Sequence, residues 1–161
     1  VWCVPAFTAG ALAASGDPAL RKSVLAGLGT TIGLVVGYYG YAEFGRDGMG
    51  SPFWPVAWLV TALVSGPLFG AAGAWWRRGR TVHRRVVGLA ALAGVFGTEA
   101  ILAGWVLHYA AQAWTCAALL VVIPAALAHG HRERALTLLT ALPLSAIAYV
   151  AVELPLQHVS G

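Results

Sequence analysis

Five long runs of apolar residues constrain this chain more than any other feature of its sequence. A bilayer core of roughly 30 Å is crossed by about 20 residues of helix. The runs of this length are Val24–Glu43, Trp54–Trp76, Val86–Tyr109, Ala110–Ala128 and Ala135–Leu154. Because lipid offers no water to the backbone N–H and C=O groups, we expect each run to form a helix.

A shorter apolar run, Val1–Ala14, indicates a sixth span that is truncated at its start. We therefore predict an all-α polytopic transmembrane bundle of six spans, or seven in a longer chain that begins with another span. We expect one integral membrane domain over residues 1–161. The boundary between the third and fourth runs is marked only by the interfacial character of Tyr109, Gln112 and Trp114.

The composition argues against a soluble enzyme or a nucleic-acid-binding module. Only 10% of the residues are charged and 59% are hydrophobic, whereas soluble domains carry roughly 25% charged residues. The net charge of +4 comes from basic clusters between the apolar runs, so we expect no nucleic-acid partner. Cys3, Cys116 and the histidines lack the spacing of metal ligands, so we predict neither a metal site nor a cofactor.

The basic residues lie in alternate loops, which predicts the orientation in the membrane. Four of the six acids and one arginine lie elsewhere. We expect the protein to lie in the plasma membrane. The positive-inside rule then places the basic loops in the cytoplasm, and the loop Gly45–Phe53 and the C-terminus Gly161 outside the cell. The basic residues that define the inner side are Arg21, Lys22, Arg77, Arg78, Arg80, Arg84, Arg85, Arg132 and Arg134.

Three glutamates recur along the chain at intervals of about 55 residues. Glu43, Glu99 and Glu153 each lie on a span that runs outward, and Tyr39 and Tyr149 stand four residues before the first and the last. This spacing predicts a helical-hairpin unit of about 55 residues repeated in parallel. Chance similarity between apolar segments is the alternative.

The same glutamates are the main functional signal, because an acid inside a span costs roughly 2.5–3.5 kcal/mol and usually faces the bundle interior or a cavity. Glu99 lies about 20 Å along its helix from Val86, on an otherwise apolar face. The alternative to a functional role for Glu99 is a structural one, in which its side chain is protonated and forms a hydrogen bond with a neighbouring helix. Glu43 and Glu153 lie near outer helix ends, where water is reachable. For these two, the alternative to a functional role is an acid at the membrane surface with no binding role.

Aromatic side chains are concentrated in the same outer halves of the predicted spans. An interfacial belt accounts for many of them without a binding role. Together with carboxylates, aromatic faces suit a ligand that carries a positive charge or an aromatic ring. The candidate ligand-binding residues are Glu99, Glu43, Glu153, Tyr39, Trp105 and Tyr149.

Glycines recur at helical spacing on two spans, and smooth glycine faces let helices approach closely in lipid. We predict that both faces pack inside the bundle. The residues of the first face are Gly29, Gly33, Gly37 and Gly40, and those of the second are Gly66, Gly70 and Gly73.

Three functions fit these features, and all place the chain in a lipid bilayer. The first is binding or transport of a small cationic or aromatic molecule in an outward-facing pocket of acids and aromatics. The second is a membrane-embedded enzyme in which Glu99 acts as general acid on a lipid-soluble, isoprenoid-like substrate. The third is an accessory or structural subunit that contacts a membrane protein partner through its glycine faces.

Three glycine-containing motifs lie between Val24 and Glu99. They are Val36-Gly37-Tyr38-Tyr39, Ser65-Gly66-Pro67-Leu68-Phe69-Gly70-Ala71-Ala72-Gly73 and Gly94-Val95-Phe96-Gly97-Thr98-Glu99. In these motifs the chain resembles a family of small, uncharacterised, actinobacterial multi-pass membrane proteins. The resemblance implies the multi-pass architecture and a further span before the first residue, and it carries no function.

Overall fold

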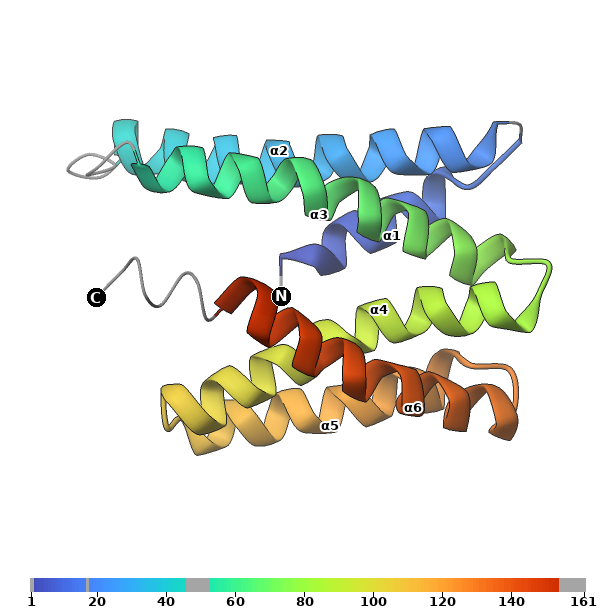
Figure 1. Ribbon diagram of the computed structural model, residues 1–161. Coiled ribbons are helices and arrows are strands. Elements are labelled where there is room, and N and C mark those ends of the chain that lie inside the picture. Colours follow the sequence, from blue (N-terminus) through green and yellow to red (C-terminus); the bar gives the residue numbers. More distant parts are fainter. Residues whose placement is uncertain (1, 17, 46–52, 154–161) are drawn as a thin grey trace. The chain divides into compact units, whose positions relative to one another are not determined.

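The computed structural model describes residues 2–16, 18–45 and 53–153, and this part of the chain is helical apart from short turns (Figure 1). No strand occurs within those ranges, which confirms the predicted all-α fold. In chain order the elements are α1 (Cys3–Ala13), α2 (Ala19–Gly45), α3 (Phe53–Arg78), α4 (Val82–Ile101), the π-helix η1 (Leu102–Val106), α5 (Ala110–Leu127), α6 (His131–Ala148) and the π-helix η2 (Tyr149–Glu153).

Five helices are long and apolar enough to cross a membrane, and they coincide with the five predicted runs. The shorter apolar helix α1 lies at the position of the truncated sixth span. The predicted boundary near Tyr109 is confirmed, because the chain leaves the helix after Val106 and resumes it at Ala110. Residues 46–52 of the predicted outer loop and the C-terminal Gly161 lie outside the described residues.

The helices form two compact units: α1, α2 and α3 make up one, within Trp2–Arg78, and α4, α5 and α6 make up the other, from Gly79 onward. The observed grouping is thus three helices to a unit. The single domain over residues 1–161 and the hairpin repeat of about 55 residues stay predictions.

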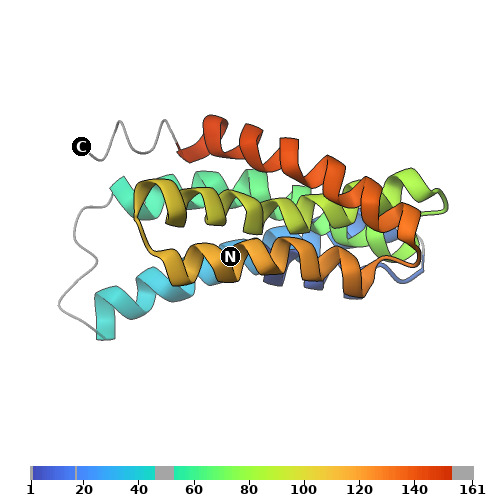
Figure 2. The ribbon, with the colours of Figure 1, turned by 90° about the horizontal axis from the view of Figure 1, so that it is seen from below.

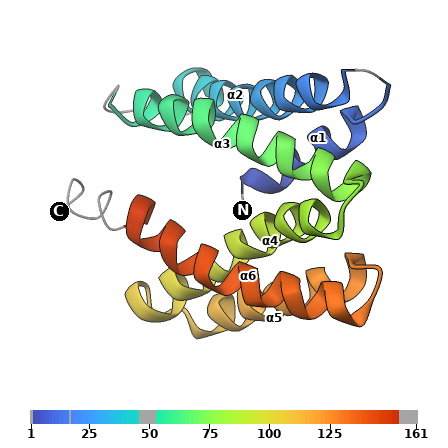
Figure 3. The same cartoon turned by 45° about the vertical axis from the view of Figure 1, so that its right-hand side comes forward.

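Glycines let the helix backbones of the α1–α3 unit approach closely. A Cβ atom added to Gly27 of α2 would lie 2.7 Å from the Cα of Gly70 on α3, and one added to Gly10 of α1 would lie 2.5 Å from the same Cα. Gly66 and Gly73 of α3 are enclosed in the same way by the backbones of α2 and α1. As a result α2 packs along α3, and α1 runs beside the C-terminal half of α3 (Figures 1 and 3).

The two predicted glycine faces differ in the structure. The face on α3 packs inside the unit, as predicted. The predicted face on α2 does not pack against the helices of its own unit, because nothing lies within 4 Å of a Cβ added at any of its glycines. Instead α2 uses another face, on which Gly27 and Thr31 are buried, because these two residues fit against the backbones of Gly66 and Gly70. The open positions on α2 are Gly29, Gly33, Gly37 and Gly40.

In the α4–α6 unit, α4 is the central helix: it packs against both α5 and α6, which contact each other little (Figure 2). The buried Ser145 hydroxyl lies 2.8 Å from the carbonyl of Ala141 on its own helix and 3.1 Å from that of Gly94 on α4. A second bond joins the same two helices, because the Thr98 hydroxyl of α4 donates to the Ser145 carbonyl of α6 at 3.2 Å. Small side chains therefore bring α4 and α6 together, and hydroxyl–carbonyl bonds fix their register. The core cluster of the unit consists of Ala90, Ala93 and Ala141.

Candidate functional site: an aromatic pocket in the α1–α3 unit

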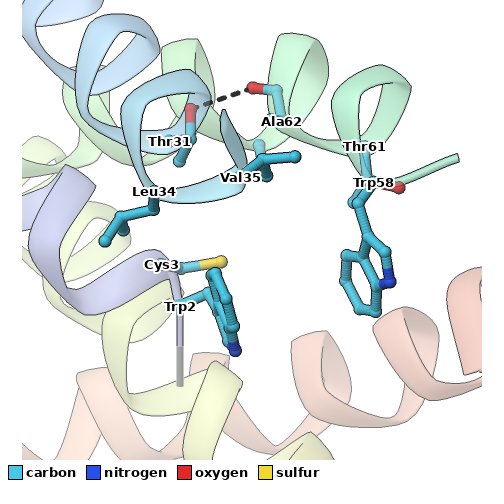
Figure 4. Close-up of a pocket in the computed structure, with 9 residues that line it drawn as sticks. Trp2, Cys3, Thr31, Leu34, Val35, Trp58, Thr61 and Ala62 are labelled. Carbon is cyan, nitrogen blue, oxygen red and sulfur yellow. Dashed lines mark hydrogen bonds between the residues drawn. The ribbon is translucent and has the colours of Figure 1, made fainter. Parts of the chain in front are cut away.

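The α1–α3 unit contains a pocket of about 80 Å³ whose exposed walls are almost entirely apolar (Figure 4). Trp2 and Cys3 at the start of α1 form one side, α2 contributes the next wall, and Trp58 of α3 stands across from Trp2. The lining residues are Trp2, Cys3, Thr31, Leu34, Val35, Trp58, Thr61, Ala62 and Ser65.

Helical spacing explains why these side chains meet. The four α3 residues stand at positions i, i+3, i+4 and i+7, which lie on one helical face, and the three α2 residues stand at i, i+3 and i+4. The close approach of Gly10 to Gly70 then brings the start of α1 alongside both faces. The pocket is therefore a product of the glycine contacts that hold the unit together.

Four aromatic rings form a connected cluster at the pocket. The rings of Trp2 and Trp58 are nearly parallel, with centroids 6.5 Å apart and an interplanar angle of 20°. Trp2 also meets Tyr38 edge to face at 5.6 Å, and Tyr38 meets Tyr39 in the same geometry at 5.1 Å. Hence the cluster extends from the pocket along α2 toward its C-terminal end.

Three hydroxyl residues, Thr31, Thr61 and Ser65, supply polar atoms to this otherwise apolar site. The Thr31 hydroxyl lies 3.0 Å from the Leu28 carbonyl of its own helix and 3.2 Å from the Ala62 carbonyl across the α2–α3 contact (Figure 4). The Thr61 hydroxyl donates to the Ala57 carbonyl at 2.9 Å. A hydroxyl has a single hydrogen, and both threonines donate theirs to the backbone. What Thr31 and Thr61 retain for a ligand is therefore their oxygen lone pairs.

Two of the six predicted site residues belong to this unit. Tyr39 is half-buried and is part of the aromatic cluster. Glu43 is exposed and lies two helical turns beyond Val35, about 12 Å further along α2. Glu43 thus stands beyond the pocket, on the helix that forms one of its walls.

The other four predicted residues belong to the α4–α6 unit. Glu99 is half-buried and follows Thr98, and Tyr149 is half-buried one turn after Ser145. Since the Thr98 hydroxyl donates to the Ser145 carbonyl, Glu99 on α4 and Tyr149, which directly follows α6, both lie within about one helical turn of this bond. That one pocket gathers all six residues stays a prediction, because they are divided between the two units.

The ends of α4 and α6 share an unusual backbone form. Trp105 belongs to the π-helix η1, and its side chain is 83% exposed. Tyr149 begins the π-helix η2 and Glu153 ends it, with the Glu153 side chain outside the described part of the chain. π-helical turns are rare and occur frequently at functional sites. Among the described residues, no three His, Cys, Asp or Glu side chains are grouped to hold a metal ion.

Sequence reasoning missed most of the pocket. None of the six predicted ligand-binding residues lines it, and neither of its tryptophans is named in the sequence analysis. A usable signal was present on α3, where a tryptophan and two hydroxyl residues share one helical face. No comparable pattern on α1 singles out Trp2.

These observations define a class: the protein is a polytopic α-helical membrane protein with an apolar, aromatic-lined pocket in one of its helical units. Residues 1–158 match a family of unknown function, DUF6518, and the chain belongs to that family. The match extends well beyond Val24–Glu99, where the sequence resemblance lay, and the actinobacterial affiliation stays a prediction. No curated protein and no solved structure matches the chain.

Proposed function

We propose that this membrane protein binds a small organic cation with apolar substituents in the aromatic pocket of its α1–α3 unit, as a binding or transport protein. The observation that carries the proposal is the pair of nearly parallel tryptophan rings, Trp2 and Trp58, beside the hydroxyls of Thr31 and Thr61. Aromatic faces attract cations, by about 0.5–1 kcal/mol at exposed sites and about 2 kcal/mol or more where water is excluded.

The position of the pocket supports a ligand of this kind. Thr31 lies about 10 Å along α2 from Val24, where the predicted span begins, and so well inside a bilayer core of roughly 30 Å. At that depth a ligand must be largely apolar, and any charge must be met by ring faces or by oxygen lone pairs. In the predicted orientation Glu43 stands nearer the outer surface, where its carboxylate attracts cations toward the site.

The proposal retains the predicted plasma-membrane location, with the basic loops in the cytoplasm and the C-terminus outside. Transport itself, an enzyme that uses Glu99 as general acid, and an accessory subunit with a membrane protein partner remain predictions from the sequence.

The proposal is tested by thermal unfolding of the purified protein with benzyltrimethylammonium and with its neutral carbon isostere, neopentylbenzene. We expect the cation to stabilise the native protein and also the Trp114→Leu variant, whose tryptophan is 77% exposed on α5 and does not line the pocket. Trp58→Leu removes one ring face, so its affinity for the cation falls about 5- to 30-fold.

Two outcomes count against the proposal in different ways. If neither probe stabilises the native protein, binding at the pocket is refuted. If the neutral isostere stabilises as well as the cation and Trp58→Leu abolishes both effects, the pocket binds aromatic molecules and the preference for a cation is wrong.

A further inference from the structure

The basic end of the α4–α6 unit is held together by one carboxylate. The Arg85 Nε of α4 donates to the Glu133 Oε1 of α6 at 3.1 Å, and the Arg85 Nη2 bonds the same oxygen. The other carboxylate oxygen, Oε2, accepts from the backbone N–H of His129 at 3.1 Å. The Arg85 Nη1 also donates to the Gly79 carbonyl at 3.3 Å. The N-termini of α4 and α6 therefore lie side by side.

This pairing leaves an excess of positive charge at that end. Glu133 is the only acid in residues 79–98 and 128–134, and Arg85 already neutralises it. Arg80, Arg84 and Arg132 are exposed there. We call these three residues and Arg134 the basic patch.

Two further features make the basic patch a suitable place for an anion. The Nε of Arg134 is buried and has no hydrogen-bond partner within the described structure. The N-cap of α6 is Gly130, which has no side chain to accept from the first amide groups of the helix, and a helix N-terminus carries partial positive charge. The Arg134 Nε and the first amide groups of α6 thus add hydrogen-bond donors to the positive charge of the basic patch. The local sequence offers no further acid to satisfy them.

The surface next to the basic patch indicates what kind of anion it suits. Arg132, Leu136 and Leu139 follow one another at helical spacing on α6, and both leucines are exposed. A molecule whose phosphate meets Arg132 can therefore lay an apolar chain over the two leucines. That combination of an anionic group and a long apolar tail is the chemistry of an anionic phospholipid.

We propose that the basic patch binds the phosphate of an anionic phospholipid headgroup, with Arg84 and Arg132 as its main ligands and the lipid tail along Leu136 and Leu139. This site is independent of the aromatic pocket and of the proposed function. Basic side chains near a membrane surface each contribute to binding anionic lipid, and they act together when they converge from two helix ends.

The basic residues also set the orientation of the chain, and the two roles differ in what they require. Orientation depends on charge in short loops during insertion and is indifferent to where the side chains lie afterwards. Lipid binding requires Arg84 and Arg132 to converge in the folded unit, so it is lost when those two are replaced and kept when an equal charge is removed elsewhere.

The test uses the purified full chain in a neutral detergent, with phosphatidylglycerol, phosphatidylcholine or sodium glycerol phosphate added. We expect phosphatidylglycerol to raise the unfolding temperature of the native protein more than phosphatidylcholine does. The double variant Arg84→Gln/Arg132→Gln should bind phosphatidylglycerol about 30-fold more weakly by native mass spectrometry. The matched control is Arg21→Gln/Arg78→Gln, which removes two exposed charges from the α1–α3 unit and should keep the native affinity.

Three results would overturn the proposal. The first is equal stabilisation by phosphatidylglycerol and phosphatidylcholine. The second is a full effect from glycerol phosphate alone, which would make the patch a site for soluble anions. The third is an equal loss in the control variant, which would show a diffuse effect of net charge. If the double variant does not fold, each single variant is measured instead, with an expected loss of about fivefold.

Discussion

The packing of α2 against α3 is tested most directly by adding one methyl group to each of two faces of the same helix. Gly27→Ala places a Cβ atom 2.7 Å from the Cα and 2.9 Å from the backbone nitrogen of Gly70, and it also contacts the Gly66 carbonyl. Gly33→Ala places the same atom in open space, two turns further along α2.

The expected difference follows from these contacts. Carbon atoms pack favourably at about 3.5–4.0 Å, so α2 and α3 must separate by about 1 Å to admit the methyl group at Gly27. The neighbouring atoms are backbone and cannot rotate away, so the cost lies toward the upper part of the usual 1–3 kcal/mol for overpacking. Separation also weakens the contact of Thr31 with the Ala62 carbonyl, which contributes about 0.5–1.5 kcal/mol.

The gain in helix propensity from glycine to alanine is the same in both variants and cancels in the comparison. Gly27→Ala should therefore be about 2–4 kcal/mol less stable than Gly33→Ala. Reversible unfolding by titration with sodium dodecyl sulfate in mixed micelles measures this difference. Equal stabilities, or a larger loss at Gly33, would refute the assignment of the packed face.

Two further predictions concern single groups. Glu133→Gln removes the charge that joins the ends of α4 and α6 through Arg85. Because both side chains are partly exposed, we expect the free energy of unfolding to fall by about 1–3 kcal/mol in the same titration. A smaller fall in the Arg85→Gln background would verify the pairing, and an unchanged fall would contradict it. His108 adopts a φ of 57°, a backbone conformation that disfavours a side chain by about 1–2 kcal/mol. His108→Gly should therefore stabilise the protein by about 1 kcal/mol, and His108→Ala should not. Equal effects of the two substitutions would show that the turn conformation is not the cause.

The positions of the helices could be predicted because lipid leaves the chain few alternatives. A run such as Val86–Tyr109 must bond its backbone internally, so its length alone indicates a span. Even the poorly marked boundary near Tyr109 follows, since two spans need a reversal between them and the interfacial residues gather at that point. These predictions rest on local sequence, and they succeed for that reason.

The packed face of α2 could not be predicted in this way. One face offers Gly27 and Thr31, the other offers Gly29, Gly33 and Gly37, and both satisfy the rule that small residues let helices approach. What decides between them is the shape of α3, where the backbones of Gly66 and Gly70 accept the first face. Complementarity between segments distant in sequence is not contained in the periodicity of either one.

The candidate site shows the same division between local and distant information. An acid such as Glu99 is conspicuous in a sequence because charge is expensive in lipid. A pocket of tryptophans and hydroxyls carries no such cost, since Trp58 is acceptable at an interface and Thr31 can satisfy itself by bonding to its own helix. Such a pocket becomes visible only when α1 brings Trp2 across from Trp58. The proposed binding site therefore consists of residues that the glycine contacts bring together, and the residues that are most costly in the membrane stay predicted site residues.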